Sequence, residues 1–294
     1  MNVYKERGYT SHDVVAKLRG IVKQKRIGHT GTLDPEAEGV LPVCLGTATR
    51  VCELLTDERK TYRATLRLGV ETDTEDLTGT VLRSEAVSCT AEEAVQCILS
   101  FQGEILQIPP MYSARKVHGK KLYELARQGM EVEREARPVT IDRICVETVE
   151  LPQVIFTVTC SKGTYIRTLC ADIGKKLGCG GCMEALVRTA VGPFDLAHAI
   201  RLGAIEQLRD EGRLSAAVLP TDAMFQCDRA LHVQGESEKR VKNGNPLVLS
   251  ASEYQKLRPE NAERFRVYSA SGEFLALYTW RLQENCFRPV KMFV

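Results

Sequence analysis

The sequence predicts an α+β protein with a mixed, largely antiparallel sheet, flanking helices and a small β-rich unit at the C-terminal end. Stretches typical of strands and helices alternate irregularly, and several strand-like stretches are neighbours in sequence, which disfavours a doubly wound parallel sheet. The 294 residues suffice for one large domain and a smaller one. We expect the larger domain to span 1–224 and the smaller one 225–294.

In the N-terminal part, Thr10 or Ser11 can cap a first helix whose apolar residues share one face. These residues are Val14, Val15, Leu18, Ile21 and Val22. "VLPVCL" is short and apolar enough for a buried strand, and "ATRVCELL" is typical of a helix. "TYRATLRL" alternates as a strand does.

Further along, Thr90 to Glu93 forms a capping-box pattern that predicts a helix with Ala94, Val95, Ile98 and Leu99 on its apolar face. "VIFTVTC" is rich in β-branched residues and predicts a strand. Apolar residues then recur at helical spacing from Ile166 to Leu177. After a junction near 219–231, "RFRVYS" and "FLALYTW" around "ASG" predict a hairpin.

Several features bound the class of protein. The first residues lack the apolar core of a signal peptide, and no later run approaches membrane-spanning length. Eleven cysteines, an odd number scattered over a long chain, are typical of reduced thiols. We therefore expect a cytoplasmic protein without a membrane partner.

The net charge of +2 is not informative, but its distribution is. Residues 14–33 hold five Lys or Arg and no acidic residue, and residues 115–143 hold eight Lys or Arg against five Asp or Glu. Taken alone, each stretch is explained as well by a solvated surface as by a binding surface. Two such stretches beside unusual loops favour a polyanionic partner.

Common cofactor and metal motifs are missing from the sequence. It contains no G-x-x-x-x-G-K-[ST], G-x-S-x-G or H-E-x-x-H pattern, and its five histidines are dispersed. "CGGC" at 179–182 stands alone and follows a predicted helix, so a glycine-rich turn with incidental thiols is favoured over a metal or redox site. We expect no cofactor and no metal.

The loop from Gly28 to Gly46 holds Asp34 directly before a proline, which pushes the aspartate toward an extended backbone. Gly28, Gly31 and Gly39 let the chain turn sharply and let a bulky ligand approach it. A tight turn in which Asp34 only bonds its own loop is the first explanation for an isolated Asp-Pro. Composition alone does not decide between the two.

"GHTGTLDPEAEGVLPVCLGTATR" resembles the catalytic signature of the TruB family, the bacterial tRNA pseudouridine synthases. "KTYRATLRLGVETDTEDLTG", "QIPPMYSARKVHGKKLYELARQG" and "CSKGTYIRTLCADIGKKLG" are similar to its second motif, its RNA-gripping insertion and its arginine-bearing motif. Order and spacing fit from residue 1 to about 220, although the chain reads "YKERGYTS" where the family usually has Asp-Lys-Pro. The resemblance implies a pseudouridine synthase fold, an RNA-gripping insertion at about 106–138 and a PUA-like RNA-binding C-terminal domain.

The resemblance also implies a reaction. Uridine 55 in the T loop of tRNA would be isomerised to pseudouridine, by breaking the N-glycosidic bond, turning the flipped base and rejoining it through carbon. Such an isomerase needs no cofactor. Its partner would be the tRNA T stem-loop, with no protein partner implied, and we expect a monomer.

By the same resemblance, Asp34 is the nucleophile, with attack on C6 of the uracil or on C1′ of the ribose left open. Arg167 is the cation that keeps this carboxylate ionised. Tyr62 stacks on the target uracil and removes the proton from C5. The remaining expected substrate-binding residues are His29 beside the flipped base, Tyr165 and Leu186 lining the pocket, and Lys5, Lys120 and Lys121.

Two other classes of function are alternatives to a pseudouridine synthase, an RNA-binding module and a glycoside hydrolase. A tRNA-binding or folding module without turnover would not need Asp34, Tyr62 and Arg167 together. A glycoside hydrolase would use Asp34 with Glu36 or Glu38, and would need two carboxylates on either side of a sugar.

Overall fold

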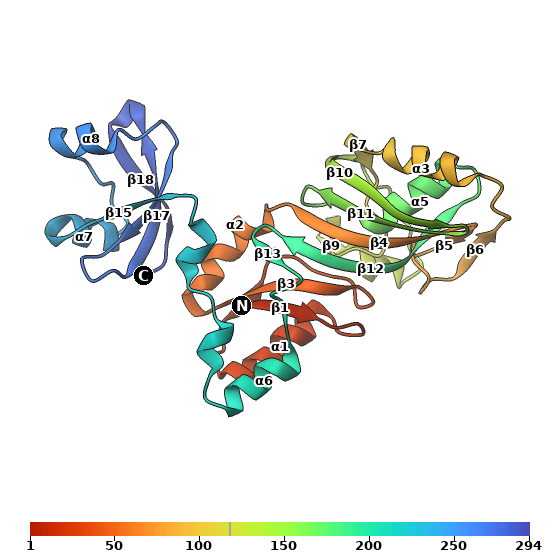
Figure 1. Ribbon diagram of the computed structural model, residues 1–294, viewed down its shortest axis with the longest axis horizontal. Helices are drawn as coiled ribbons and strands as arrows, with labels where there is room; N and C mark the ends of the chain where they lie inside the picture. The colour runs from red at the N-terminus through yellow and green to blue at the C-terminus, as the bar shows by residue number, and fades with distance from the viewer. Residues whose placement is uncertain (118) are drawn as a thin grey trace.

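The computed structural model describes residues 1–117 and 119–294. Within them the chain forms one ten-stranded sheet and a second, four-stranded sheet, which lies at the far end of the molecule (Figure 1). The helices of the described chain all fall short of the length and apolar character needed to cross a membrane.

The larger sheet follows the order β14-β1-β3-β12-β4-β11-β10-β7, with β2 paired to β3 and β13 paired to β12. The pairings β1–β14 and β3–β12 are parallel, and the others described in this sheet are antiparallel, which confirms the predicted sheet type. Its strands are β1 (Asn2–Lys5), β2 (Ile27–His29), β3 (Glu38–Leu45), β4 (Lys60–Leu68), β7 (Gly103–Gln107), β10 (Arg137–Glu150), β11 (Gln153–Cys160), β12 (Gly181–Val191), β13 (Phe194–Asp195) and β14 (Ile200–Arg201).

Helices cover this sheet in two groups. Helices α1 and α6 pack together near the N-terminal strands, whereas α3 and α5 lie side by side over the other half (Figure 1). The two groups cover separate apolar cores, one containing Leu18 and Leu41 and the other Phe156 and Leu169. The helices are α1 (Ser11–Val22), α2 (Cys52–Thr56), α3 (Ala91–Leu99), α4 (Leu122–Ala126), α5 (Ile166–Lys176) and α6 (Leu202–Asp210).

Helix starts follow the predicted capping signals. Thr10 caps α1 and forms a capping box with Asp13, and Thr90 does the same for α3 with Glu93. The predicted helix "ATRVCELL" is a 3₁₀ turn, Gly46–Val51, followed by the short α2. The segment is therefore helical, but its first half is wound more tightly than an α-helix.

Two small hairpins are separate from the larger sheet. One pairs β5 (Val70–Thr72) with β6 (Val81–Ser84), and the other pairs β8 (Lys116–Val117) with β9 (Lys120–Lys121). The second hairpin and α4 lie between β7 and β10, inside the predicted insertion at 106–138. His118 of that insertion lies outside the described residues.

The smaller sheet has the order β15-β16-β17-β18, and its antiparallel pair β16–β17 confirms the predicted hairpin. Trp280, Phe265 and Phe287 fill its core. Its last strand contacts the larger domain, where Arg50 Nη1 donates to the carbonyl of Met292 at 2.9 Å. The elements are β15 (Arg229–His232), α7 (Gly235–Lys242), α8 (Ala251–Leu257), β16 (Arg264–Tyr268), β17 (Phe274–Arg281) and β18 (Cys286–Met292).

Candidate active site

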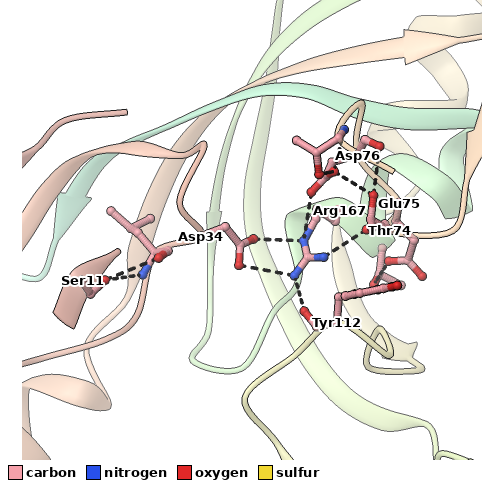
Figure 2. Close-up of polar contacts among 10 residues, drawn as sticks. Ser11, Asp34, Thr74, Glu75, Asp76, Tyr112 and Arg167 are labelled. Atoms are coloured by element: carbon pink, nitrogen blue, oxygen red, sulfur yellow. Dashed lines mark hydrogen bonds and ion pairs between the residues drawn. The ribbon is translucent and has the colours of Figure 1, made fainter. Parts of the chain in front are cut away.

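The loop that carries Asp34 joins β2 to β3 and is hydrogen-bonded to the N-terminal segment. Ser11 Oγ accepts from the amide of Leu33 at 3.0 Å (Figure 2), and the amide of Gly8 donates to the carbonyl of Pro35 at 2.9 Å. The amide of Ala37 donates to the carbonyl of Asp34 at 3.1 Å, which closes the turn. These bonds fix the backbone on both sides of the carboxylate.

Lys5 occupies a different place from the one expected. Its side chain is buried, with 0% of the residue exposed, and Nζ donates to the carbonyls of Pro35 (3.0 Å), Tyr9 (2.5 Å) and Glu6 (3.2 Å). Burial lowers the pKa of Lys5 to about 8, while the negative charge of Asp34 acts in the opposite direction. An ammonium enclosed by three carbonyls is not exposed for contact with RNA in this structure, where Lys5 instead holds the loop around Pro35.

Asp34 and Arg167 face each other as a two-point ion pair. Nε of Arg167 lies 3.0 Å from Oδ2 of Asp34, and Nη2 lies 3.4 Å from Oδ1 (Figure 2). The arginine side chain is only 6% exposed, whereas the aspartate side chain is 40% exposed. The guanidinium therefore orients the carboxylate and leaves it accessible from outside.

Arg167 is itself held by two further loops. Nη1 donates to the carbonyl of Thr74 at 3.0 Å, and Nη2 donates to the carbonyl of Tyr112 at 2.8 Å. Oδ2 of Asp76 lies 3.9 Å from Nε (Figure 2). Sequence reasoning missed these three residues, two of which act through backbone carbonyls that side-chain identity does not reveal.

The loop that contains Asp76 has a sequence signal that could have been used. Oδ1 of Asp76 accepts from the hydroxyls of Thr74 (2.8 Å) and Thr78 (2.5 Å). A Cβ on Gly79 would lie 2.3 Å from the Asp73 carboxylate, so the turn needs glycine there. The alternation of Thr and Asp before this glycine indicates a self-bonded loop.

Tyr62 lies on β4, half-buried, and packs against the same apolar cluster as Leu33 and Leu186. Burial raises the pKa of the Tyr62 phenol, and the nearby Arg188 opposes that shift. Leu186 is buried on β12. The structure thus brings Tyr62, Leu186 and the base of the Asp34 loop together.

The other two expected pocket residues frame this site. His29, half-buried at the end of β2, packs edge-on against His12 with ring centroids 5.9 Å apart. Burial lowers its pKa, which favours the neutral ring. Tyr165 precedes α5, and its amide donates to Oε1 of Gln107 at 3.0 Å, which pins the start of the helix that carries Arg167.

Lys120 and Lys121 lie on β9 of the protruding hairpin, and Lys120 is exposed. Lys121 Nζ lies 5.4 Å from the ring centroid of Tyr123. The protruding segment meets the site at Tyr112, whose carbonyl accepts from Arg167. The hairpin and the ion pair therefore belong to one connected structure.

Cys179, in the turn between α5 and β12, and Cys182, at the start of β12, are buried free thiols. Burial raises the pKa of Cys182 to about 11, so this thiol is not poised for redox chemistry. In residues 1–117 and 119–294, no group of three or more His, Cys, Asp or Glu is arranged to hold a metal ion.

Comparison with known proteins adds to this geometry. The N-terminal domain of the TruB family pseudouridylate synthases matches residues 19–166, and the tRNA pseudouridylate synthase B C-terminal domain matches residues 167–226. A tRNA pseudouridine synthase B of Lachnoclostridium phytofermentans is 49% identical over 303 residues, covering 100% of this chain and 99% of that one. One of Alkaliphilus oremlandii is 51% identical over 247 residues, covering 84% and 82%.

Solved structures show the same fold. The chain is similar to one in the crystal structure of a Cbf5-Nop10-Gar1 complex, with a TM-score of 0.73 and 26% identity, covering 100% of this chain and 84% of that one. A chain in an H/ACA RNP bound to a substrate RNA containing 2′-deoxyuridine gives the same TM-score at 24% identity, with the same coverage.

Proposed function

The chain belongs to the TruB family of pseudouridylate synthases, and we propose that it uses Asp34 to isomerise uridine 55 in the T loop of tRNA to pseudouridine. The observation that carries the role of Asp34 is its two-point pairing with Arg167, at 3.0 and 3.4 Å, on a carboxylate that is still 40% exposed. A carboxylate fixed in orientation yet reachable from outside is suited to nucleophilic attack.

The proposed reaction is an isomerisation. The Asp34 carboxylate adds to C6 of the uracil or to C1′ of the ribose, and the bond between N1 and C1′ breaks. The base turns, and a bond forms between C5 and C1′ as the nucleophile leaves. C5 loses its proton and N1 gains one, so that product and substrate have the same mass.

The other pocket residues would hold the flipped nucleotide. Tyr62 would stack on the uracil and later accept the C5 proton, with Leu186 and Tyr165 lining the pocket and His29 beside the base. Nucleotides of the T loop lie outside a regular duplex, so extracting one costs less than flipping a base from a helix. Lys5, enclosed by carbonyls, instead holds the loop around Pro35.

The substrate is a tRNA, and we propose that the T stem-loop is the part recognised and that the enzyme acts as a monomer in the cytoplasm. Lys120 and Lys121 on the protruding hairpin would contact phosphates. The unit at 225–294 would bind RNA as a PUA-like domain, and 1–224 would form the catalytic domain.

The glycoside hydrolase alternative has less support. Arg7 Nε donates to Glu36 at 2.7 Å, and Tyr4 Oη donates to Glu38 at the same distance. Both carboxylates that could assist Asp34 are therefore engaged by other side chains, which disfavours a second acid poised across a sugar.

The decisive experiment uses a T-loop transcript labelled with tritium at C5 of uridine. Asp34→Asn keeps the shape of the side chain but removes the nucleophile, so tRNA binding should persist while tritium release stops. Glu36→Gln is the matched control, since Glu36 lies two residues away and pairs with Arg7, and it should retain activity. Substantial pseudouridine from Asp34→Asn would contradict the mechanism, and release of free uracil by the parent enzyme would favour a hydrolase.

A further inference from the structure

Arg188, on β12, lies beneath the loop that carries Asp34. It is 1% exposed, its Nε donates to the carbonyl of Val40 at 2.7 Å, and its Nη2 donates to the carbonyl of Gly31 at 3.1 Å. Gly31 lies in the loop before Asp34, and Val40 lies on β3 just after the loop. One buried guanidinium therefore ties together the segment before the nucleophile and the segment after it.

Two glycines, Gly31 in the loop and Gly39 on β3, lie against Arg188. Gly39 has φ +107°, and a Cβ there would lie 2.3 Å from the carbonyl oxygen of Arg188. Gly31 has φ +144°, and a Cβ there would lie 3.6 Å from Nη1 of the same arginine. The space left free by Gly39 is thus filled by the backbone of Arg188, its partner in the β3–β12 pairing, rather than by a ligand, contrary to the expectation from the sequence.

The charge of Arg188 has no carboxylate partner among residues 1–117 and 119–294, where its hydrogen bonds go to backbone carbonyls. Arg167, by contrast, faces Asp34 and Asp76. Lys60, close to Arg188, also donates only to carbonyls in the described chain, those of Thr56 and Glu58. A buried cation without a matching anion is costly, and the site therefore favours groups that become negative during the reaction.

Tyr62 is the cross-strand neighbour of Arg188. The two residues are directly opposite in the antiparallel pair β4–β12, so their side chains lie on the same face of the sheet. Arg188 lowers the pKa of the Tyr62 phenol against the effect of burial, whereas Cys160 from β11 and Asp34 from the loop raise it. Arg188 is thus the cation that favours the phenolate form.

We propose that Arg188 is a positioning residue for this reaction, which clamps both arms of the Asp34 loop and keeps a positive charge beside the Tyr62 hydroxyl group. The inference rests on the proposed function, in which Tyr62 accepts the C5 proton. The proton passes from C5 to the phenolate oxygen, which becomes a neutral phenol, and the electron pair of the C–H bond returns to the ring. A cation held beside that oxygen keeps the phenolate available.

Arg188→Gln and Arg188→Lys separate charge from hydrogen bonding, because each retains a donor but only lysine retains the charge. The measurement is single-turnover tritium release from C5-labelled T-loop RNA, across neutral and alkaline pH. The rate should rise with pH as the Tyr62 phenol ionises. In Arg188→Gln the midpoint of this rise should lie about one pH unit or more above that of the parent. At pH values below the midpoints of both proteins, the variant should therefore be about tenfold slower. Arg188→Lys should keep a midpoint close to that of the parent. An unchanged midpoint in Arg188→Gln would overturn the proposal, even if the rate falls equally at every pH.

Two controls isolate the effect. Lys60→Gln removes another buried cation that bonds only carbonyls in the described chain, and it should lower stability without moving the midpoint. In a Tyr62→Phe background, Arg188→Gln should cause no shift, since the titrating phenol is absent. If Arg188→Gln does not fold, Arg188→Lys still tests the clamp: it should be slower than the parent at every pH, and a parent-like rate would overturn it.

A second measurement does not depend on turnover. Tyrosinate absorbs in the ultraviolet, so the absorbance of the parent enzyme minus that of Tyr62→Phe, followed against pH, reports the ionisation of Tyr62 in the free enzyme. The same difference in the Arg188→Gln background should titrate at higher pH, and coincident curves would overturn the proposal. If the parent enzyme releases no tritium at all, the proposed function fails, and the absorbance titration still decides the role of Arg188.

Discussion

Replacing Arg167 by methionine removes the group that orients the nucleophile and the cation that is paired with it. Both oxygens of Asp34 lose their contacts, at 3.0 and 3.4 Å. The carbonyls of Thr74 and Tyr112 lose their donor. Arg167→Lys keeps the charge, but a single ammonium cannot reproduce the two-point contact and serve both carbonyls.

The expected loss can be worked from the geometry. Two unit charges about 4 Å apart interact by about 4 kcal/mol at an effective dielectric constant near 20. Because the Asp34 side chain is 40% exposed, water screens part of this interaction energy, and we take about 3 kcal/mol for the ion pair. That corresponds to roughly 10²-fold in rate, in line with the ~10²–10³-fold cost of losing one preorganised electrostatic contact. We expect Arg167→Met to fall by at least this factor, and Arg167→Lys by about tenfold or more.

Single-turnover tritium release measures the chemical step, and filter binding of the tRNA measures affinity separately. Binding should be nearly unchanged in both Arg167 variants. Arg7→Met is the matched control, since Arg7 is an exposed arginine paired with Glu36 on the same loop, and its rate should stay near that of the parent. A near-normal rate in Arg167→Met would refute the reasoning and leave Asp34 to be oriented by another group.

Three more predictions test other parts of the site. Tyr62→Phe keeps the ring but not the hydroxyl, so binding should survive while the rate falls by about 10²-fold or more; Tyr62→Leu should lose both, and near-normal rates in both variants would assign Tyr62 to the core alone. Binding should weaken with salt with a log–log slope of about −0.7 per phosphate contacted on single strands, and Lys120→Glu with Lys121→Glu should flatten it; an unchanged slope would make the hairpin a merely solvated face. The pKa of Lys5 is lowered to about 8 in the folded protein, against about 10.4 in the unfolded chain. Between these two pH values the unfolded state binds more protons than the folded state. The contribution of Lys5 to the free energy of unfolding therefore increases as the pH rises from about 8 to about 10.4. Over that pH range the free energy of unfolding of the parent, measured with denaturant, should therefore rise relative to that of Lys5→Met. Parallel plots of this free energy against pH for the two proteins would contradict the lowered pKa.

Features fixed by neighbouring residues could be predicted from the sequence. The capping boxes at Thr10 and Thr90 mark the starts of α1 and α3, and alternation in "TYRATLRL" marks β4. The pairing of β16 with β17 follows from two apolar runs around a short turn. In each case the signal and the structure lie within a few residues of each other.

Features fixed by distant residues could not be predicted in the same way. Arg188 is a single cation in "EALVRTAV" and reads as a surface residue, because nothing in that stretch indicates that the Asp34 loop will cover it. Lys5 is expected to contact RNA only through the resemblance, and its enclosure depends on the carbonyl of Pro35 on another segment. Thr74 and Tyr112 contribute backbone oxygens, which every residue type carries.

The two members of the ion pair come from opposite sides of a short seam in the larger sheet. Strands β3 and β12 are paired in parallel at only two positions, Glu38 with Val187 and Gly39 with Arg188. Asp34 precedes β3, whereas Arg167 lies on α5, which packs against β12. The ion pair and the Arg188 side chain therefore link the two halves of the sheet across this short pairing. A relative displacement of the two halves would separate Asp34 from Arg167, so the alignment of the nucleophile depends on this short pairing.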